Sequence, residues 1–305
     1  VLITPVTFTT AANANSNIGT YDIIPGGASA NGYDFSFVNG TLTIDPVLLT
    51  IRANDASRLY GAASPSFSAT FVGLVAGDMQ SDISGLTFTT DAAVDSDVGE
   101  AYTITPANAS NDNYSISFYN GSFSITPADL LITAKSFVRH YGDANPVLTA
   151  MFDGLVAGDT ESDISHLTLT TTALNTADVN VYEIEPAGAS HNNYNISFAP
   201  GTLTVTPRPL TITAENKERL FGDNNPTFTL DFDNLASFDN ASAISSILVS
   251  TSAVRLSDVG EYVIEVSGGT NSNYAINTVD GSLQINPRPI TITALDTNRE
   301  YGDVN

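Results

Sequence analysis

Short runs in which apolar and polar residues alternate recur throughout the chain. Alternation with a period of two residues is typical of a β-strand with one buried face. Residues 49–53 form one such run, and residues 67–71 form the next. The positions expected to be buried in the first strand of each repeat are Leu49, Ile51 and Ala53; Leu130, Ile132 and Ala134; and Leu210, Ile212 and Ala214. The pattern predicts a mainly β structure.

Two strands near the end of each repeat are separated by a dipeptide that favours a tight turn. These dipeptides are Asn39-Gly40, Asn120-Gly121, Pro200-Gly201 and Asp280-Gly281. Asn-Gly and Asp-Gly suit a type I′ hairpin turn, in which both central residues have positive φ. Proline excludes that turn type at Pro200. A hairpin register would place Phe118 opposite Phe123 and Ile116 opposite Ile125, and likewise Phe37 opposite Leu42 and Phe35 opposite Ile44.

Three markers repeat with steps of 81, 80 and 80 residues. They are a proline that ends a strand (Pro46, Pro127, Pro207, Pro287), an aromatic residue followed by glycine (Tyr60-Gly61, Tyr141-Gly142, Phe221-Gly222, Tyr301-Gly302), and a tyrosine (Tyr33, Tyr114, Tyr194, Tyr274). A fixed period of this length indicates a tandem array. We predict the C-terminal half of a repeat at 1–46, whole repeats at 47–127, 128–207 and 208–287, and the first strand of another at 288–305.

The fold class expected for this array is mainly β, with small antiparallel β domains. Each domain is either an immunoglobulin-like sandwich or a β-grasp-like unit with one short helix. The second alternative requires that the link at residues 159–164 forms a helix, for which its acidic start provides a capping residue. The linkers are short and proline-rich, as at residues 207–209. Proline stiffens such a joint, so an elongated, monomeric rod is expected.

Charge and composition narrow the function. The chain has 33 acidic and 10 basic residues, a net charge of −23, and no cysteine. An excess of acid argues against nucleic acid and anionic membrane surfaces as partners. Disulfides and thiolate metal sites are excluded, and no run of 18 apolar residues predicts a membrane span. No nucleophile elbow or phosphate-binding loop occurs, so no enzyme activity, catalytic residue or cofactor is expected.

One basic residue recurs in register with the repeat. An arginine stands two residues before each aromatic-glycine pair, at Arg58, Arg139, Arg219 and Arg299. It is either a structural contact that fixes the turn or the joint, through an ion pair or a cation–π contact, or a repeated contact to a ligand. We favour the structural interpretation, because an isolated arginine in an acidic chain readily finds a carboxylate.

Acidic clusters and histidines offer weaker candidates for metal binding. Calcium favours several carboxylate oxygens and would suit clusters at domain joints, but no calcium-loop motif occurs. The clusters are Asp95, Asp97 and Glu100, which align with Asn175, Ala177 and Asn180 in the next repeat, and Asp159, Glu161 and Asp163. The three histidines, His140, His166 and His191, stand at separate turns of one repeat and are interpreted as surface residues. Solvated surface charge is the favoured interpretation, and calcium the minor alternative.

Three segments resemble a known family of repeats. They are Tyr141-Gly142-Asp143-Ala144-Asn145-Pro146, Gly154-Leu155-Val156-Ala157-Gly158-Asp159-Thr160, and Ser197-Phe198-Ala199-Pro200-Gly201-Thr202-Leu203-Thr204-Val205. They are similar to the MBG/YDG-type repeats of large bacterial surface adhesins, including filamentous-haemagglutinin-like secreted proteins. The sequence departs from this pattern at Ala62-Ala63-Ser64-Pro65, at Phe221 and at Ser237-Phe238-Asp239.

The resemblance implies an extracellular role in cell-surface adhesion and no catalytic residues. The favoured function is that of stalk repeats that project a distal binding domain, with neighbouring repeats of the same chain as partners. The alternative is a multivalent array that binds host or matrix glycans or proteins weakly, and gains avidity by repetition.

Overall fold

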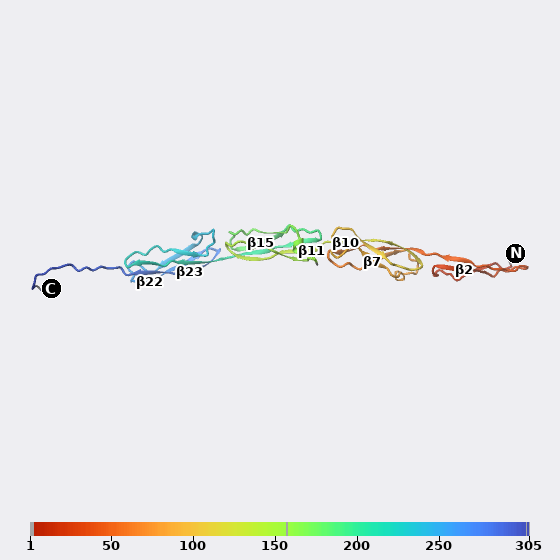
Figure 1. The fold of residues 1–305 in the computed structure, drawn as a ribbon, viewed down its shortest axis with the longest axis horizontal. Coiled ribbons are helices and arrows are strands. Elements are labelled where there is room, and N and C mark those ends of the chain that lie inside the picture. Colours follow the sequence, from red (N-terminus) through yellow and green to blue (C-terminus); the bar gives the residue numbers. More distant parts are fainter. Residues whose placement is uncertain (1–2, 157, 303, 305) are drawn as a thin grey trace. The chain divides into compact units, whose positions relative to one another are not determined.

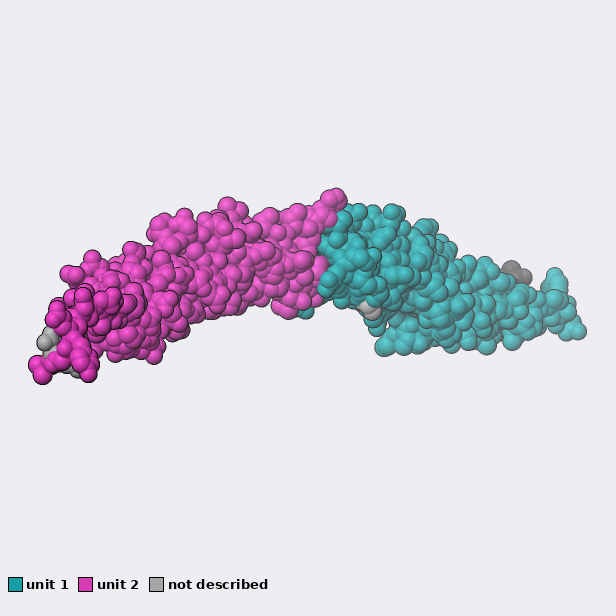
Figure 2. Space-filling view, turned by 60° about the vertical axis from the view of Figure 1, so that its left-hand side comes forward, with its two compact units in different colours: residues 1–131, 153–165, 189–197 teal, residues 132–152, 166–188, 198–305 magenta. Residues whose placement is uncertain are grey.

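The computed structural model describes residues 3–156, 158–302 and 304. Residues 1–2 of the predicted segment 1–46, residue 157 of the quoted motif, and residues 303 and 305 of the segment 288–305 lie outside the described residues. The chain forms two compact units. Unit 1 contains residues 1–131, 153–165 and 189–197, and unit 2 contains the remaining residues (Figure 2). The boundary between the two units passes through strands of the repeat 128–207. All the contacts between consecutive repeats that are described below therefore join residues of the same unit.

Strands dominate every repeat (Figure 1). Residues 3–46 contain β1 (Thr7–Thr10), β2 (Gly19–Gly26) and β3 (Gly40–Ile44). The repeat 47–127 contains β4 (Val47–Ala53), β5 (Ala56–Leu59), β6 (Ala69–Val72), the 3₁₀ turn η1 (Gln80–Asp82), β7 (Thr87–Thr90), β8 (Tyr102–Ala107), β9 (Tyr114–Tyr119) and β10 (Gly121–Thr126).

The next two repeats contain the same elements in the same order. The repeat 128–207 has β11 (Ala128–Ala134), β12 (Phe137–His140), β13 (Ala150–Asp153), η2 (Glu161–Asp163), β14 (Thr168–Thr171), β15 (Asn180–Ala187), β16 (Tyr194–Ala199) and β17 (Gly201–Thr206). The repeat 208–287 has β18 (Arg208–Ala214), β19 (Lys217–Leu220), β20 (Leu230–Asp233), η3 (Ala241–Ala243), β21 (Ser245–Thr251), β22 (Gly260–Thr270), β23 (Tyr274–Val279) and β24 (Gly281–Asn286).

Each complete repeat has a three-stranded and a four-stranded sheet. In the repeat 47–127 the strand orders are β6-β4-β9 and β5-β10-β8-β7, and the next two repeats have the corresponding orders. Three of the five pairings are antiparallel, whereas β4 runs parallel to β9 and β5 runs parallel to β10. Residues 3–46 form one sheet, β1-β2-β3, which corresponds to β7-β8-β10.

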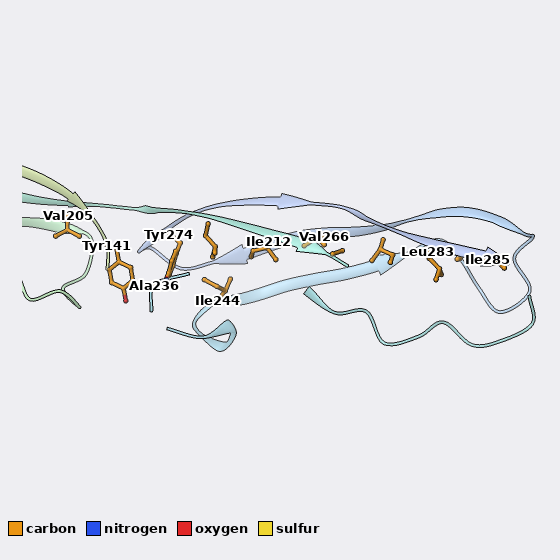
Figure 3. Close-up of a cluster of buried hydrophobic side chains, with 13 residues drawn as sticks. Tyr141, Val205, Ile212, Ala236, Ile244, Val266, Tyr274, Leu283 and Ile285 are labelled. Atoms are coloured by element: carbon orange, nitrogen blue, oxygen red, sulfur yellow. The ribbon is translucent and has the colours of Figure 1, made fainter. Parts of the chain in front are cut away.

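The core lies between the two sheets. Leu49 and Ile51 of β4 are completely buried, and Ala53 packs with Ile104 of β8 and Phe123 of β10. Figure 3 shows the equivalent row of side chains in the repeat 208–287, from Ile212 to Ile285. The alternation observed in the sequence therefore identified the buried face of the first strand correctly in all three complete repeats.

The predicted closing hairpin is wrong. β9 and β10 follow one another in the chain but belong to different sheets, so Phe118 pairs with Ile51 and Phe123 with Tyr102 and Ala56. In residues 3–46 the segment 34–39 forms no strand, so the pairs of Phe35 and Phe37 with β3 are not made either.

None of the four predicted turn dipeptides contains a residue with positive φ. The glycine of each dipeptide must therefore be required for another reason. A Cβ atom on Gly121 would lie 2.7 Å from the carbonyl oxygen of Ala53. The same clash would occur at 2.4 Å between Gly201 and Ala134. The close approach of two backbones therefore excludes a side chain where the chain passes from one sheet to the other.

The link that distinguished the two fold alternatives is a single 3₁₀ turn. Asp163 accepts a hydrogen bond from the backbone N–H of Thr160 at 2.7 Å, which caps the turn η2 and lowers the pKa of the Asp163 carboxyl group. No α-helix occurs among residues 3–156, 158–302 and 304, and accordingly no helix there is long and apolar enough to cross a membrane. The two-sheet arrangement is thus present, and the helix required by the β-grasp alternative is not.

Candidate functional site at the joints between repeats

One set of polar contacts recurs where consecutive repeats meet. We call these contacts joint 1 (between 3–46 and 47–127), joint 2 (between 47–127 and 128–207) and joint 3 (between 128–207 and 208–287). Joints 1 and 2 lie within unit 1 and joint 3 lies within unit 2. Each joint contains an asparagine that immediately precedes the recurring tyrosine of the later repeat.

Asn193 is the centre of joint 2. Its side chain is held between the two repeats, because Oδ1 accepts a hydrogen bond from the N–H of Val98 at 2.9 Å and Nδ2 donates to Asp97 Oδ1 at 2.7 Å. Its carbonyl oxygen accepts the N–H of Ala128, the first residue of β11, at 3.0 Å. Asn193 is only 3 % exposed. A buried amide with its donor and acceptor both satisfied fixes orientation as well as distance, since hydrogen bonds are directional.

The same arrangement recurs at the other joints. In joint 3 the Asn273 side chain accepts from the N–H of Val179 at 2.9 Å and donates to Asp178 at 2.7 Å. In joint 1 the Asn113 side chain accepts from the N–H of Ile18 at 3.0 Å and donates to the side-chain oxygen of Asn17 at 3.0 Å. An asparagine thus replaces the aspartate in joint 1, without loss of the hydrogen bond.

A short turn presents each of these asparagines. The N–H of Asn113 is bound by Asn111 Oδ1 at 3.0 Å, and the N–H of Asn273 by Asn271 Oδ1 at 2.8 Å. In joint 2 a histidine replaces that asparagine, and the N–H of Asn193 is bound by His191 Nδ1 at 3.2 Å. His191 is therefore part of a joint rather than an isolated surface residue.

The recurring tyrosine forms the second part of joints 2 and 3. The Tyr194 hydroxyl accepts from the N–H of Val156 at 3.0 Å and donates to Asp159 at 2.5 Å. Tyr60 of the preceding repeat packs edge-on against its ring, with centroids 5.6 Å apart. Burial raises the pKa of Tyr194 to about 12, and the hydrogen bond to Asp159 adds to this rise. The phenol is therefore neutral at physiological pH and serves as a hydrogen-bond donor.

Joint 3 has the same aromatic contact (Figure 3). Tyr141 packs edge-on against Tyr274 at 5.5 Å, and Phe238 contacts the ring of Tyr141 at 5.6 Å. The Tyr274 hydroxyl donates to Asp239 at 2.6 Å, and burial again raises its pKa to about 12. Tyr141 belongs to the same buried cluster as the core of the repeat 208–287, so apolar packing is continuous through joint 3.

The glycine after each aromatic residue lets the two repeats touch. A Cβ atom on Gly61 would lie 2.3 Å from Val156, and one on Gly142 would lie 2.8 Å from the Cβ atom of Ala236. Both glycines also have positive φ, +72° and +82°. The aromatic-glycine pair is thus a joint motif, in which the ring packs against the next repeat and the glycine leaves room for it.

Joint 3 also contains an ion pair. Arg208 Nη1 lies 2.7 Å from Asp143 Oδ1, and the same guanidinium donates to the carbonyl and side-chain oxygens of Asn234 at 2.9 Å. Arg288 forms the corresponding ion pair with Asp223. Joint 2 has Ala128 and Ala62 at these two positions.

The structure places three of the four predicted arginines inside the repeats. Arg58, Arg139 and Arg219 are 6 %, 6 % and 7 % exposed. Each Nη2 donates to a main-chain carbonyl oxygen in the loop after β7 or its counterparts, at residue 93, 174 or 254. None of the three ion pairs among the described residues involves them, so the expected carboxylate partner is wrong. Of these three arginines, Arg58 alone has a cation–π contact to a described residue, 5.9 Å from the ring centroid of Phe123.

Arg299 differs from the other three arginines in its exposure, and the partner of the arginine Nε atom differs between the complete repeats. Arg299 is exposed, within the strand-free segment that follows β24. Asn145 and Asn225 accept from Nε of Arg139 and Arg219 at 2.8 Å. The corresponding residue in the first complete repeat is Ser64, and Arg58 Nε is buried without a partner.

The acidic clusters are divided among separate structural contacts. Asp97 binds Asn193, Asp159 binds Tyr194, and Asp163 caps η2. In the described part of the chain, no group of three or more His, Asp or Glu side chains is placed to hold a metal ion. The sequence alignment that placed Asp97 opposite Ala177 is wrong by one residue. Asp97 corresponds to Asp178, which makes the equivalent contact in joint 3. His140 Nδ1 lies 3.0 Å from Thr206 Oγ1 of the same repeat.

The asparagine contact was missed by sequence reasoning. Its signal was available as two dipeptides in the 80-residue register: Asn-Tyr at 113, 193 and 273, and Asp-Val at 97, 178 and 258. Only the tyrosine of the first dipeptide was used. The partners are 96 residues apart in the sequence, so no local pattern links them.

A family model described as the MBG domain (YGX type) matches residues 3–43, 49–124, 130–204 and 210–284. No curated protein matches the chain.

Solved structures show only weak similarity. The three N-terminal domains of the highly immunogenic outer capsid protein Hoc of bacteriophage RB49 are 10 % identical, with 93 % of this chain and 99 % of that chain covered and a TM-score of 0.23. The catalytic M60 domain with two CBM51 domains of ZmpB from Clostridium perfringens is 8 % identical, with 94 % and 37 % covered and a TM-score of 0.21. The four N-terminal Ig domains of Dscam1 isoform 1.9 are 9 % identical, with 91 % and 82 % covered and a TM-score of 0.16. TM-scores of this size support no inference about this chain.

The four matched segments together span most of the sequence, and they contain the aromatic-glycine pairs of the complete repeats that build joints 2 and 3. The chain therefore belongs to the MBG domain (YGX type) family, as a tandem array of such repeats.

Proposed function

We propose that this chain is a spacer segment of an extracellular bacterial adhesin, in which consecutive repeats are held in a fixed orientation so that a distal binding domain is projected from the cell surface. The observation that carries the proposal is the recurrence of one set of contacts at three joints, centred on Asn113, Asn193 and Asn273. A flexible tether would need no such contacts.

Each complete joint combines directional hydrogen bonds with packing of aromatic rings, and the two together restrict rotation. The Asn193 amide fixes the loop at residues 97–98 against the start of β11, and the Tyr60 ring packs against Tyr194 in the same joint. Buried hydrogen bonds lose most of their energy when donor and acceptor turn away from each other. A linear array in which each repeat contacts only its neighbours gains stability and stiffness from such interfaces.

Further support comes from composition and from the family. A net charge of −23 limits self-adhesion in solution, and a chain without cysteine is insensitive to the redox state of its surroundings. Arg58, Arg139 and Arg219 are buried, which supports a structural role for these three residues over a contact to a ligand.

Distances between two spin labels test whether a joint is rigid. The chain has no cysteine, so Ser124→Cys in β10 and Asn195→Cys in β16 give two unique labelling sites on either side of joint 2. The expected result is one narrow distance distribution, which broadens in the variant with Asn193→Ala and Tyr60→Ala. The neighbouring exposed Asn192→Ala is the matched control and leaves the distribution unchanged. A broad distribution in the unaltered chain would contradict the spacer function.

A further inference from the structure

Two segments of the repeat 47–127 run parallel to each other through both sheets. We call residues 47–59 the leading segment and residues 114–126 the closing segment. Six residue pairs join the two segments in the three-stranded sheet, and four pairs join them in the four-stranded sheet. Partners are separated by the same number of residues in both sheets. The two segments therefore pass from one sheet to the other together, without a change of register.

Further hydrogen bonds make this ladder continuous. At the point where the segments change sheets, the Asp55 carboxylate accepts a hydrogen bond from the N–H of Ser122 at 2.7 Å. At the end of the ladder, the N–H of Tyr60 donates to the carbonyl oxygen of Thr126 at 2.9 Å. The side chain of Asp55 thus bridges the interval between the two sets of paired residues.

The ladder and its bridge recur in the other complete repeats. The paired ranges are 208–213 with 274–279, 217–220 with 283–286, and 137–140 with 203–206. Ser136 takes the place of Asp55 and accepts from the N–H of Thr202 at 3.1 Å, and Asn216 accepts from the N–H of Ser282 at 2.8 Å. Three different side chains therefore supply the same acceptor, which indicates that the bridge itself matters.

Tension along the chain acts on the two segments in opposite directions. The chain enters the repeat at the start of the leading segment and leaves it at the end of the closing segment. Because the segments are parallel, pulling draws them past each other lengthwise. The hydrogen bonds of a ladder lie across the strands, so lengthwise sliding must break them together. Separation of two strands from one end would instead break the bonds one after another.

The recurring arginine holds the shorter part of this ladder in place. β5, which ends the leading segment, lies at one edge of the four-stranded sheet, and β7 lies at the other edge. The buried Arg58 of β5 donates to the carbonyl oxygen of Ala93, in the loop that follows β7. Arg139 and Arg219 make the same contact in their repeats, at 2.6 and 2.7 Å. The arginine thus ties the edge strand to the far side of its sheet.

We propose that the leading and closing segments form a load-bearing clamp, by which each complete repeat resists tension along the chain. The recurring arginine is a positioning residue of this clamp. Load bearing goes beyond the spacer function, because a fixed orientation between repeats does not require that a repeat withstand pulling. That the chain comes under tension rests on the proposed role in adhesion, whereas the resistance is a property of the repeat itself.

Pulling on the full chain through two pairs of cysteine handles tests the clamp in the repeat 47–127. Leu48→Cys with Ser124→Cys loads the two segments lengthwise, whereas Leu48→Cys with Asp112→Cys separates them from one end. All three positions are exposed, and the chain has no other cysteine. At equal force, lengthwise unfolding should be at least about tenfold slower, because more bonds must break at the barrier to forced unfolding. Equal rates in the two directions would overturn the proposal.

Two matched aspartates test the bridge. Asp91 accepts a hydrogen bond from the N–H of Thr103 at 2.9 Å, which is a bond of the same kind outside the clamp. Asp55→Ala should raise the rate of lengthwise unfolding about fivefold, because its bond breaks at the barrier. Asp91→Ala is the control and should leave that rate unchanged, although both variants lower the urea midpoint of equilibrium unfolding. An equal effect of both variants on the lengthwise rate would contradict the clamp.

The clamp and the spacer function can fail separately. Broad label distances across joint 2 together with slow lengthwise unfolding would contradict the spacer function and support the clamp. Narrow label distances together with equal unfolding rates in both pulling directions would support the spacer function and overturn the clamp.

Discussion

Joints 2 and 3 perform the same task with different residues at their margins. Both contain the buried asparagine, its aspartate partner and the edge-on tyrosine pair. In joint 3 the ion pair between Arg208 and Asp143 is added, and in joint 2 alanines occupy both positions. The two charges are therefore either both present or both absent, as expected if an unpaired charge at a joint is unfavourable.

The apolar part of the joint varies in a similar way. Gly61 meets the branched side chain of Val156 in joint 2, whereas Gly142 meets the smaller Ala236 in joint 3, where Phe238 adds a second ring beside Tyr141. A smaller side chain at one position of the joint is thus accompanied by a larger one at another. The hydrogen bonds of Asn193 and Asn273, in contrast, keep equivalent partners and distances. The comparison indicates that the polar contacts determine orientation and that the apolar residues fill the remaining space.

The largest effect is expected when the shared asparagine is removed. Asn193→Ala leaves the N–H of Val98 and the Asp97 carboxylate without their buried partner, which costs about 3 kcal/mol of contact energy between the repeats. Exchange of the Val98 amide hydrogen should then accelerate about 100-fold. Asn273→Ala should act equally on Val179 in joint 3.

The control for this prediction is the neighbouring exposed residue. Asn192→Ala changes the same side chain one residue away and should leave the exchange of the Val98 amide unaltered. If Asn193→Ala accelerated exchange throughout the repeat 128–207 and not at Val98 in particular, the asparagine would support its own repeat rather than the joint.

High pH should weaken both joints through their tyrosines. Burial, and then the hydrogen bonds to Asp159 and Asp239, raise the pKa of Tyr194 and Tyr274 to about 12 from the ordinary value of 10.0. Since the folded-state pKa is the higher one, this stabilisation is complete below pH 10 and is lost as the pH rises towards 12. One pKa unit corresponds to about 1.4 kcal/mol, so each tyrosine contributes about 2–3 kcal/mol.

Label distances across joint 2, recorded between pH 9 and 12, check this prediction. The distribution should broaden in parallel with the appearance of tyrosinate absorbance. Tyr194→Phe removes the titrating group and should flatten the pH dependence, whereas Tyr119→Phe, at a 53 % exposed position, should not. Broadening that persists in Tyr194→Phe would assign the pH effect to another group.

The sequence predicted the strands of this fold better than their pairing. Alternation identified Leu49 and Ile51 as buried, because burial of one face acts on each strand independently. The Asn120-Gly121 dipeptide suggested a hairpin, yet its glycine is needed because the carbonyl oxygen of Ala53 lies too close for a side chain. A dipeptide cannot distinguish these two reasons for glycine, since the second depends on a strand that is distant in the sequence.

The joints were predicted only in part for the same reason. The recurrence of Tyr194 was noted and its place in the core expected, but its role depends on Tyr60 and Asp159, which only the fold brings together. The spacing of Arg139 predicted a structural contact, through an ion pair or a cation–π contact, or a contact to a ligand, and none of the ion pairs among the described residues includes it. Two of its partners are main-chain carbonyl oxygens, which are present at every residue and leave no trace in the sequence, and the third is the side-chain oxygen of Asn145.

A smaller effect is expected at Arg58 Nε, which is buried without a partner among the described residues. Ser64→Asn should supply Arg58 Nε with the acceptor that Asn145 provides for Arg139, and the new amide group would reach the carbonyl oxygen of Ala92. Satisfying a buried donor should stabilise the repeat 47–127 by about 1–2 kcal/mol. Slower exchange of the Ile104 and Phe123 amides would show this, with Ser66→Asn, at an exposed position, as the control. Unchanged exchange would mean that water already satisfies Arg58.

The smallest effect concerns the contact that distinguishes joint 3 from joint 2. The Asp143 side chain is 45 % exposed, and ion pairs at such positions contribute about 0–1 kcal/mol because water and salt screen them. The double variant Asp143→Ala and Arg208→Ala reproduces joint 2 and should keep the label distances across joint 3 unchanged. Arg208→Ala alone should cost more than Asp143→Ala alone, because Arg208 also binds both oxygens of Asn234. A double-mutant cycle measured by amide exchange at Val179 would separate the two terms. A coupling energy well above about 1 kcal/mol would show that joint 3 depends on its charges, and that its polar margin is more than an exchangeable addition to the asparagine contact.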